Sequence, residues 1–77
     1  MNPAQSRAAR GLLKWTQDDL AREASVSVVT VRNFENEKSA PQRATLDVMR
    51  RCLETAGVQF IPQNGGGPGV RLKEPQT

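Results

Sequence analysis

The chain has 77 residues, the size of one small domain with a modest hydrophobic core. It carries a net charge of +3, one cysteine and no histidine, so an intrachain disulfide is excluded and neither a metal site nor a cofactor is expected. Because no apolar run reaches membrane-spanning length and the N-terminus lacks a signal-peptide pattern, we expect a soluble cytoplasmic protein with no membrane partner.

The composition also argues against an enzyme. Without histidine or tyrosine, the remaining acidic, basic and hydroxyl side chains form no recognisable pair of nucleophile and base. Cys52 lies in the expected helix "VMRRCLETAG", where we interpret it as a small buried hydrophobe. The mild excess of basic residues is compatible with a nucleic-acid partner without requiring one.

Two short helices are predicted near the N-terminus. The first covers residues 3–14, because Asn2 is a good N-cap and Pro3 suits the first helical position. The second covers residues 17–24, where Thr16 is the expected N-cap and Asp19 occupies the capping-box position. The apolar positions at helical spacing are Ala8, Ala9, Leu12 and Leu13 in the first helix, and Leu20, Ala21 and Ala24 in the second.

The next stretch, "SVSVVTVRNF" at residues 25–34, allows two interpretations. Its β-branched residues are typical of a strand. A strand here would lie alone between helices, however, with no neighbour for its backbone hydrogen bonds. The alternative is a helix over residues 28–36 with Ser27 as N-cap, and Val31 and Phe34 facing inward. We favour the helix, which leaves Val28 and Val29 on the outward face.

A fourth helix and an extended arm are predicted after the loop "KSAPQR". In "ATLDVMRRCLETAG", Thr45 is the expected N-cap and Gly57 the residue that ends the helix. Leu46, Met49, Leu53 and Ala56 form its inward stripe, which Val48 and Cys52 widen. We therefore expect a helical domain over residues 1–57. The glycine-rich arm over 58–77 has β-like runs at 58–61 and 70–72, and we expect a disordered end from about Glu74.

Two short helices joined by a turn of three or four residues make a helix-turn-helix. The segment "TQDDLAREASVSVVTVRNFENEK" resembles the Cro/C1-type repressors, the XRE family. Its matching small and apolar positions are Leu20, Ala21, Ala24, Val26, Val31 and Phe34. The tail "GVQFIPQNGGGPGVRL" is similar to one found in a bacterial subgroup of short regulators. The resemblance implies an all-α domain of four to five helices with a short β-like C-terminal arm.

The sequence departs from the family pattern at two turns. Ser25 stands where the family usually has glycine, and a left-handed serine costs about 1–2 kcal/mol. Glu37 replaces the glycine of the usual "ENG", so we expect Asn36 to take the left-handed conformation instead.

In this architecture the helix over residues 28–36 lies in the DNA major groove. The residues expected to read bases are Val28, Val29, Arg32 and Asn33, the valines through thymine methyl groups. The residues expected to contact phosphates are Gln17, Ser27, Asn36, Lys38 and Arg43. The family resemblance further implies a structural ion pair between Arg10 and Glu35.

A palindromic DNA site would require a homodimer. Our hypothesis for its interface is the apolar part of the arm, Phe60, Ile61, Val70 and Leu72, with folding of the arm onto its own helices as the alternative. The function expected is a homodimeric repressor that controls its own promoter. A restriction–modification controller protein and the antitoxin of a toxin–antitoxin pair, in which the tail binds a protein partner, are the alternatives.

Overall fold

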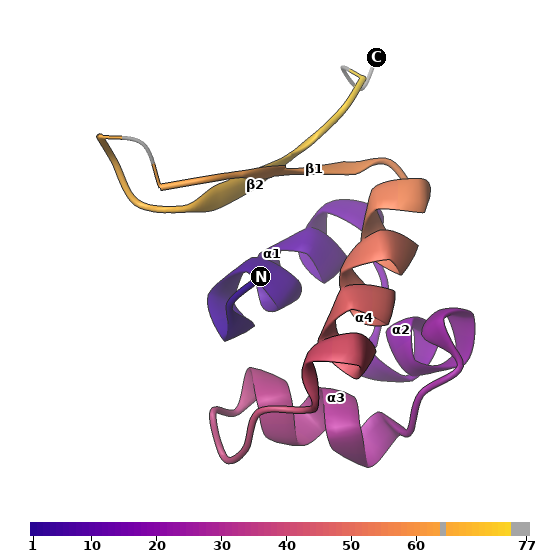
Figure 1. The fold of residues 1–77 in the computed structure, drawn as a ribbon. Helices are drawn as coiled ribbons and strands as arrows, with labels where there is room; N and C mark the ends of the chain where they lie inside the picture. The colour runs from indigo at the N-terminus through magenta and orange to yellow at the C-terminus, as the bar shows by residue number, and fades with distance from the viewer. Residues whose placement is uncertain (64, 75–77) are drawn as a thin grey trace.

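The chain folds into four helices and a C-terminal β-hairpin (Figure 1). This computed structural model describes residues 1–63 and 65–74. The helices are α1 (Pro3–Leu13), α2 (Gln17–Ala24), α3 (Val28–Glu35) and α4 (Arg43–Thr55), and the strands are β1 (Val58–Ile61) and β2 (Gly69–Leu72). The predicted helical domain with a β-like arm is confirmed, and the valine-rich stretch is helical. The expected disordered end lies mostly outside the described residues.

Side-chain caps determine where the first three helices begin. The Asn2 side chain accepts a hydrogen bond from the Gln5 backbone N–H at 2.7 Å. The Thr16 hydroxyl accepts one from Asp19 at 3.0 Å, and the Asp19 carboxylate accepts the Thr16 N–H at 2.8 Å. The Ser27 hydroxyl accepts from Val29 at 3.1 Å. These three caps are the predicted ones, and they satisfy N–H groups that have no partner inside the helix.

The start of α4 differs from the prediction. The helix begins at Arg43 after Gln42, whose side chain makes no capping hydrogen bond, so Thr45 lies inside the helix. Gly57 follows the last turn with φ +117°, a left-handed conformation that suits glycine, as its predicted role requires.

Three non-glycine residues of the described chain adopt positive φ, and two of them lie within or just after the helix-turn-helix. Ser25, in the turn between α2 and α3, has φ 56°, which is left-handed. After α3 the left-handed residue is Glu37 with φ 60°, whereas Asn36 has φ −89°. The expectation for Asn36 was therefore wrong, because α3 continues its helical hydrogen bonding through the Asn36 N–H, which bonds to the Arg32 carbonyl, and the chain reverses one residue later.

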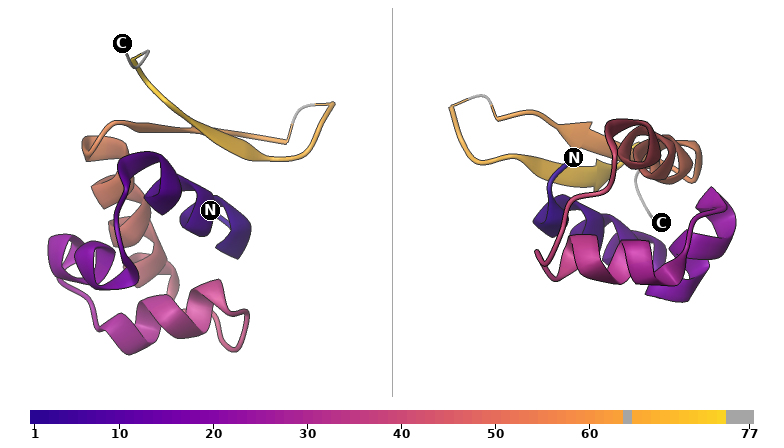
Figure 2. Two further views of the ribbon diagram at one scale, coloured as in Figure 1. Left: turned by 180° about the vertical axis from the view of Figure 1, so that it is seen from behind. Right: turned by 60° about the horizontal axis from the view of Figure 1, so that its bottom comes forward.

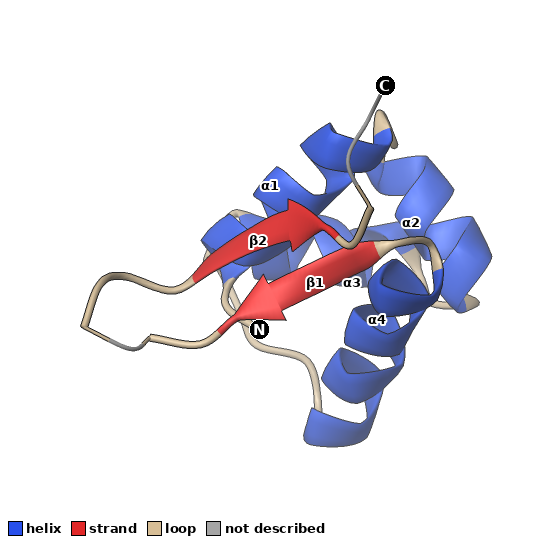
Figure 3. Cartoon of the chain, turned by 90° about the horizontal axis from the view of Figure 1, so that it is seen from above, coloured by secondary structure: helices blue, strands red, loops and turns tan. Residues whose placement is uncertain are grey.

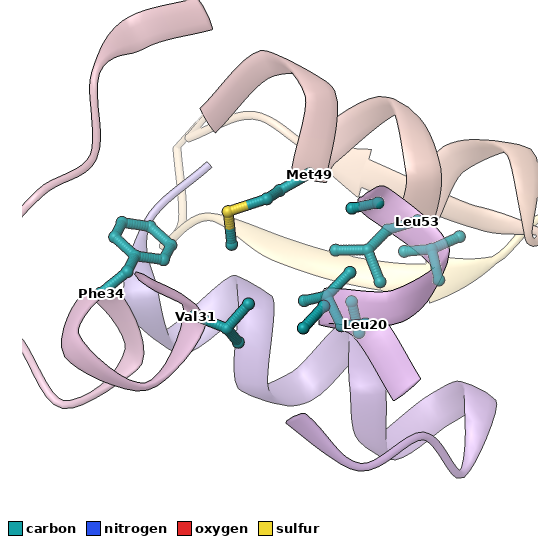
Figure 4. Packing of buried hydrophobic residues seen from close by; sticks show 9 residues of the cluster. Leu20, Val31, Phe34, Met49 and Leu53 are labelled. Atoms are coloured by element: carbon teal, nitrogen blue, oxygen red, sulfur yellow. The ribbon is translucent and has the colours of Figure 1, made fainter. Parts of the chain in front are cut away.

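The core lies where α2, α3 and α4 meet (Figure 4). Leu20, Val31, Phe34, Met49 and Leu53 point toward one another there, and each is at most 5% exposed. Three predicted inward residues do not contribute to it. Val48 is 46% exposed and Ala8 is exposed, because each lies on the solvent side of its helix. Ala56, the residue that caps the end of α4, is exposed as well. In α1 the buried side chains are instead Gln5, Ser6 and Ala9.

The hairpin folds back onto the helices of its own chain, with β2 against α1 and β1 against α4 (Figure 3). Strands β1 and β2 are antiparallel, with Val58 opposite Leu72 and Phe60 opposite Val70. These four side chains share one face of the hairpin, because alternate residues of a strand point the same way. Val58 is fully buried in the core, and Phe60 and Val70 pack against it.

The predicted dimer surface stays a prediction, but much of it already meets the helices of its own chain. Phe60 and Val70 pack against the core cluster and are partly buried. Ile61 lies on the outer face of the hairpin, and Leu72 is partly exposed near its end. The amide of Gln5 also donates to the Gly69 carbonyl at 3.1 Å, which fastens β2 to α1. The alternative, in which the arm folds onto its own helices, describes the hairpin.

Replacing Glu37 by glycine should stabilise the protein. A left-handed residue with a Cβ costs about 1–2 kcal/mol, part of which is offset by the greater freedom of glycine in the unfolded chain. We expect Glu37→Gly to raise the free energy of unfolding by about 1 kcal/mol in urea titrations. Glu37→Ala is the control, because it removes the same side chain but keeps the Cβ. Equal stabilities of the two variants would contradict this reading of the turn.

Candidate nucleic-acid interface

The helices α2 and α3 form one rigid unit joined by a turn of three residues. The Val26 N–H bonds to the Ala21 carbonyl at 2.9 Å, which closes the end of α2, and Ser27 caps the start of α3. Leu20 and Ala24 of α2 are buried with Val31 of α3. The unit therefore has the short turn and the buried helix contact of a helix-turn-helix.

The face of α3 turned away from the core carries polar and apolar side chains together. Val31, Phe34 and Glu35 point inward. Because successive residues turn by about 100°, the opposite face carries Val29, Asn33 and Asn36, with Arg32 beside them. Val29 is one of two large hydrophobic residues that the described chain leaves exposed, with 51% of its surface accessible. Figures 1 and 2 show α3 at the edge of the molecule, on the opposite side from the hairpin.

Val28 occupies an intermediate position. Its side chain is partly buried and packs against the core cluster, because it lies at the margin between the inward and outward faces of α3. The prediction that it points outward beside Val29 is therefore only partly correct. Thr30 lies at the opposite margin of the helix and is also partly buried.

Three exposed basic residues lie on α3 and in the segment that follows it. Arg32 is exposed on the helix, and Lys38 and Arg43 are exposed in the following loop and at the start of α4. Among the described residues none of these three takes part in a salt bridge. The Lys38 N–H bonds to the Asn33 carbonyl at 2.8 Å, so the loop is tied to the end of α3. These cations are free to meet an anionic partner.

The buried carboxylate of Glu35 holds the opposite face of α3 in place. Its Oε1 lies 2.6 Å from Arg10 Nη2 and accepts a hydrogen bond from Gln17 Nε2 at 3.1 Å. Its Oε2 accepts the Ser6 hydroxyl at 2.6 Å. The ion pair implied by the family resemblance is thus present, and it belongs to a network that joins α1, α2 and α3. Arg10 also donates to the Trp15 carbonyl at 3.0 Å, in the turn before α2.

The network changes the interpretation of Gln17. Sequence reasoning placed its side-chain amide on a phosphate, but the amide donates to Glu35 instead. Only its backbone N–H, at the start of α2, has the orientation typical of an anion contact. Ser6 and Arg7, whose guanidinium donates to the Glu35 carbonyl, were not predicted. For Ser6, the one signal in the sequence was its spacing from Arg10. The two residues are four positions apart and therefore share one face of α1.

The same contacts set the ionisation of Glu35. Burial by itself would raise the pKa of this carboxyl. Hydrogen bonds from Arg10, Ser6 and Gln17, together with the charge of Arg10, outweigh burial and hold the pKa below its ordinary value of 4.5. Glu35 is therefore an anion in the folded protein at neutral pH, and its negative charge compensates the positive charge of Arg10 in α1.

A helix-turn-helix family model matches residues 7–59 of the 77-residue chain, which include α2, the turn and α3. The chain belongs to the Cro/C1-type (XRE) helix-turn-helix family. It is a DNA-binding helix-turn-helix regulator. No curated protein matches its sequence. Within residues 1–63 and 65–74, no helix combines the length and apolar character needed to cross a membrane.

Loss of Arg10 should destabilise the XRE domain strongly. Arg10→Met leaves the fully buried Glu35 carboxylate without its cation, and breaking a buried pair in this way costs roughly 3–5 kcal/mol. The control is Arg22→Met, which breaks the exposed pair with Asp19 and should cost less than about 1 kcal/mol. Chemical denaturation of the three proteins measures both effects. A similar loss in the two variants would show that the Glu35 network is not a major support of the fold.

The stability of the protein should fall on acidification because of Glu35. Its folded-state pKa lies below the unfolded value, so its contribution is present above about pH 4.5 and is lost as the pH falls through the folded pKa. We expect thermal melting between pH 7 and pH 3 to show a smaller loss of stability in Glu35→Gln than in the wild type. The variant should already be the less stable protein at pH 7. Parallel pH profiles would exclude Glu35 as the source of the acid sensitivity.

Proposed function

We propose that this XRE protein is a homodimeric, sequence-specific repressor that reads palindromic DNA half-sites with α3 in the major groove and controls its own promoter. The observation that carries the proposal is the division of α3 into two faces. One face is held by the core and by Glu35. The other exposes Val29 and Arg32 and carries the half-buried Asn33, which together offer an apolar contact, a cation and an amide.

These side chains match the chemistry of base edges. Val29 has no hydrogen bond to offer, so its natural target is the C5-methyl group of thymine. Asn33 can pair with adenine through two hydrogen bonds, and Arg32 can reach the two acceptors of guanine or a nearby phosphate. Val28, at the margin of the helix, contributes a second and smaller apolar contact.

Phosphate contacts would set the register of α3 in the groove. Lys38 and Arg43 supply positive charge just after the helix, and Asn36 ends it. The Ser27 hydroxyl accepts the capping hydrogen bond, and its own hydrogen is then available to a phosphate oxygen. Gln17 takes part through its backbone N–H only. Each of these contacts adds affinity for any duplex without selecting a sequence.

A dimer follows from the small size of the reading surface. One α3 helix of eight residues reaches only a few base pairs. Two copies related by a two-fold axis double the contacts and match a palindrome whose halves lie about one helical turn, roughly 34 Å, apart.

The proposal predicts that base-reading and phosphate-contacting residues behave differently. A duplex enriched by the wild-type protein from a random library is compared with a scrambled duplex, and the DNA upstream of the gene is tested alongside. Asn33→Ala and Val29→Ala should weaken binding to the selected duplex, Asn33→Ala by roughly 1–3 kcal/mol per half-site, and leave binding to the scrambled duplex unchanged. Lys38→Gln and Arg43→Gln should weaken both and each lower the salt dependence by about one ion per subunit.

If the wild type enriches no sequence from the library, or binds both duplexes equally and with steep salt dependence, only phosphate attraction is present. Either result would overturn the proposal. Selective binding that is indifferent to Val29 and Asn33 would place the reading surface elsewhere. Increased expression from the upstream promoter when the gene is deleted tests the repressor role.

A further inference from the structure

A groove between α2 and α4 lies outside the proposed DNA-reading face, because no residue of α3 lines it. It has a volume of about 430 Å³, and α4 supplies Val48 and Cys52 to its wall. Trp15, in the turn before α2, is a further wall residue. Trp15 and Cys52 are partly buried, while Val48 is 46% exposed. Val48 and Val29 are the two exposed large hydrophobic residues of the described chain, and only Val29 belongs to the DNA-reading face.

Opposite charges stand on the two walls of the groove. Glu23 projects from α2 and Arg51 from α4, and both residues are exposed. Within the described residues they form no salt bridge with each other or with another side chain. An apolar centre with one unpaired charge of each sign at its margin can complement an identical surface on a second copy, because each charge can face its opposite.

We propose that a second copy of this chain covers the groove, with the two copies related by a two-fold axis. Val48 and Trp15 of each copy bury apolar surface at the centre, and Glu23 of each copy pairs with the partner's Arg51. The inference rests on the proposed function, in which two copies bind one palindrome, and it names the surface that joins them.

The position of the groove favours this arrangement over one built on the hairpin. Neither α3 nor the hairpin lines the groove, which lies on the flank of the molecule between them. Figure 1 shows α3 at one end of α4 and the hairpin at the other. A two-fold axis along that flank leaves both α3 helices facing the same way, toward one duplex. Packing of two hairpins face to face would instead direct the α3 helices away from each other.

Charge reversal gives a test that a folding defect cannot imitate. The mass of the full chain is measured in solution by light scattering over a range of concentrations. We expect the wild type to dimerise, and Glu23→Arg and Arg51→Glu each to raise the dimer dissociation constant at least about tenfold, because each places like charges opposite each other. An equimolar mixture of the two variants should dimerise again, since one chain then carries two cations and the other two anions. The double variant Glu23→Arg/Arg51→Glu should also recover.

Two exposed valines supply the matched control. Val48→Asp should produce a monomer, whereas Val29→Asp should lose selective DNA binding and remain a dimer. Variants that stay dimeric, or a mixture that does not reassociate, would overturn the groove interface while the repressor proposal stands. A wild type that is monomeric in solution and binds its selected duplex as one copy would overturn the interface as well. A wild-type protein that binds no DNA sequence selectively would instead count against the proposed function.

Discussion

The carboxylate of Glu35 is the interaction on which the arrangement of the helices depends. It is fully buried as a side chain, and it receives hydrogen bonds from residues of α1 and α2 while it belongs to α3. A buried anion is stable only when its oxygen atoms are all paired, so small shifts of any of the three helices expose it to a large desolvation cost. The network therefore acts as a geometric constraint on α3 as much as a source of stability.

That constraint explains how a helix rich in β-branched residues can act as a rigid reading element. Isolated, α3 has eight residues and would be marginal in water. In the protein, Val31 and Phe34 bury one side of it against Leu20 and Met49 (Figure 4), and Glu35 fastens the end. The outward side is then free for the DNA contacts that we propose, and these would account for the exposed Val29.

The hairpin completes the fold at the opposite end. Val58 enters the core, Phe60 and Val70 pack against it, and the Arg50 guanidinium lies 5.2 Å from the centre of the Phe60 ring. Two-stranded hairpins are marginal by themselves, and this one depends on the helices beneath it. The predicted arm thus packs on α1 and α4 of its own chain, and the surface that we propose for a second copy is the groove between α2 and α4.

The helices and their starts could be predicted from the sequence because the signals are local. Asn2, Thr16 and Ser27 cap their helices through residues two or three positions away, and the left-handed role of Ser25 follows from where α2 must end. The family resemblance added the pairing of Arg10 with Glu35. The caps and the turn depend on neighbours in the sequence, and the ion pair depends on a known family pattern.

What required the tertiary structure was the direction of individual side chains. Gln17 turns to Glu35 instead of solvent, Val28 lies at the margin of α3, and Val48 lies outside the core stripe, because each position depends on the exact rotation of a helix against its neighbours. The sequence could not decide which surface the hairpin packs against, for the same reason. An apolar strand face is equally suited to its own helices and to a partner, and only the folded chain shows that α1 and α4 are already there to receive it.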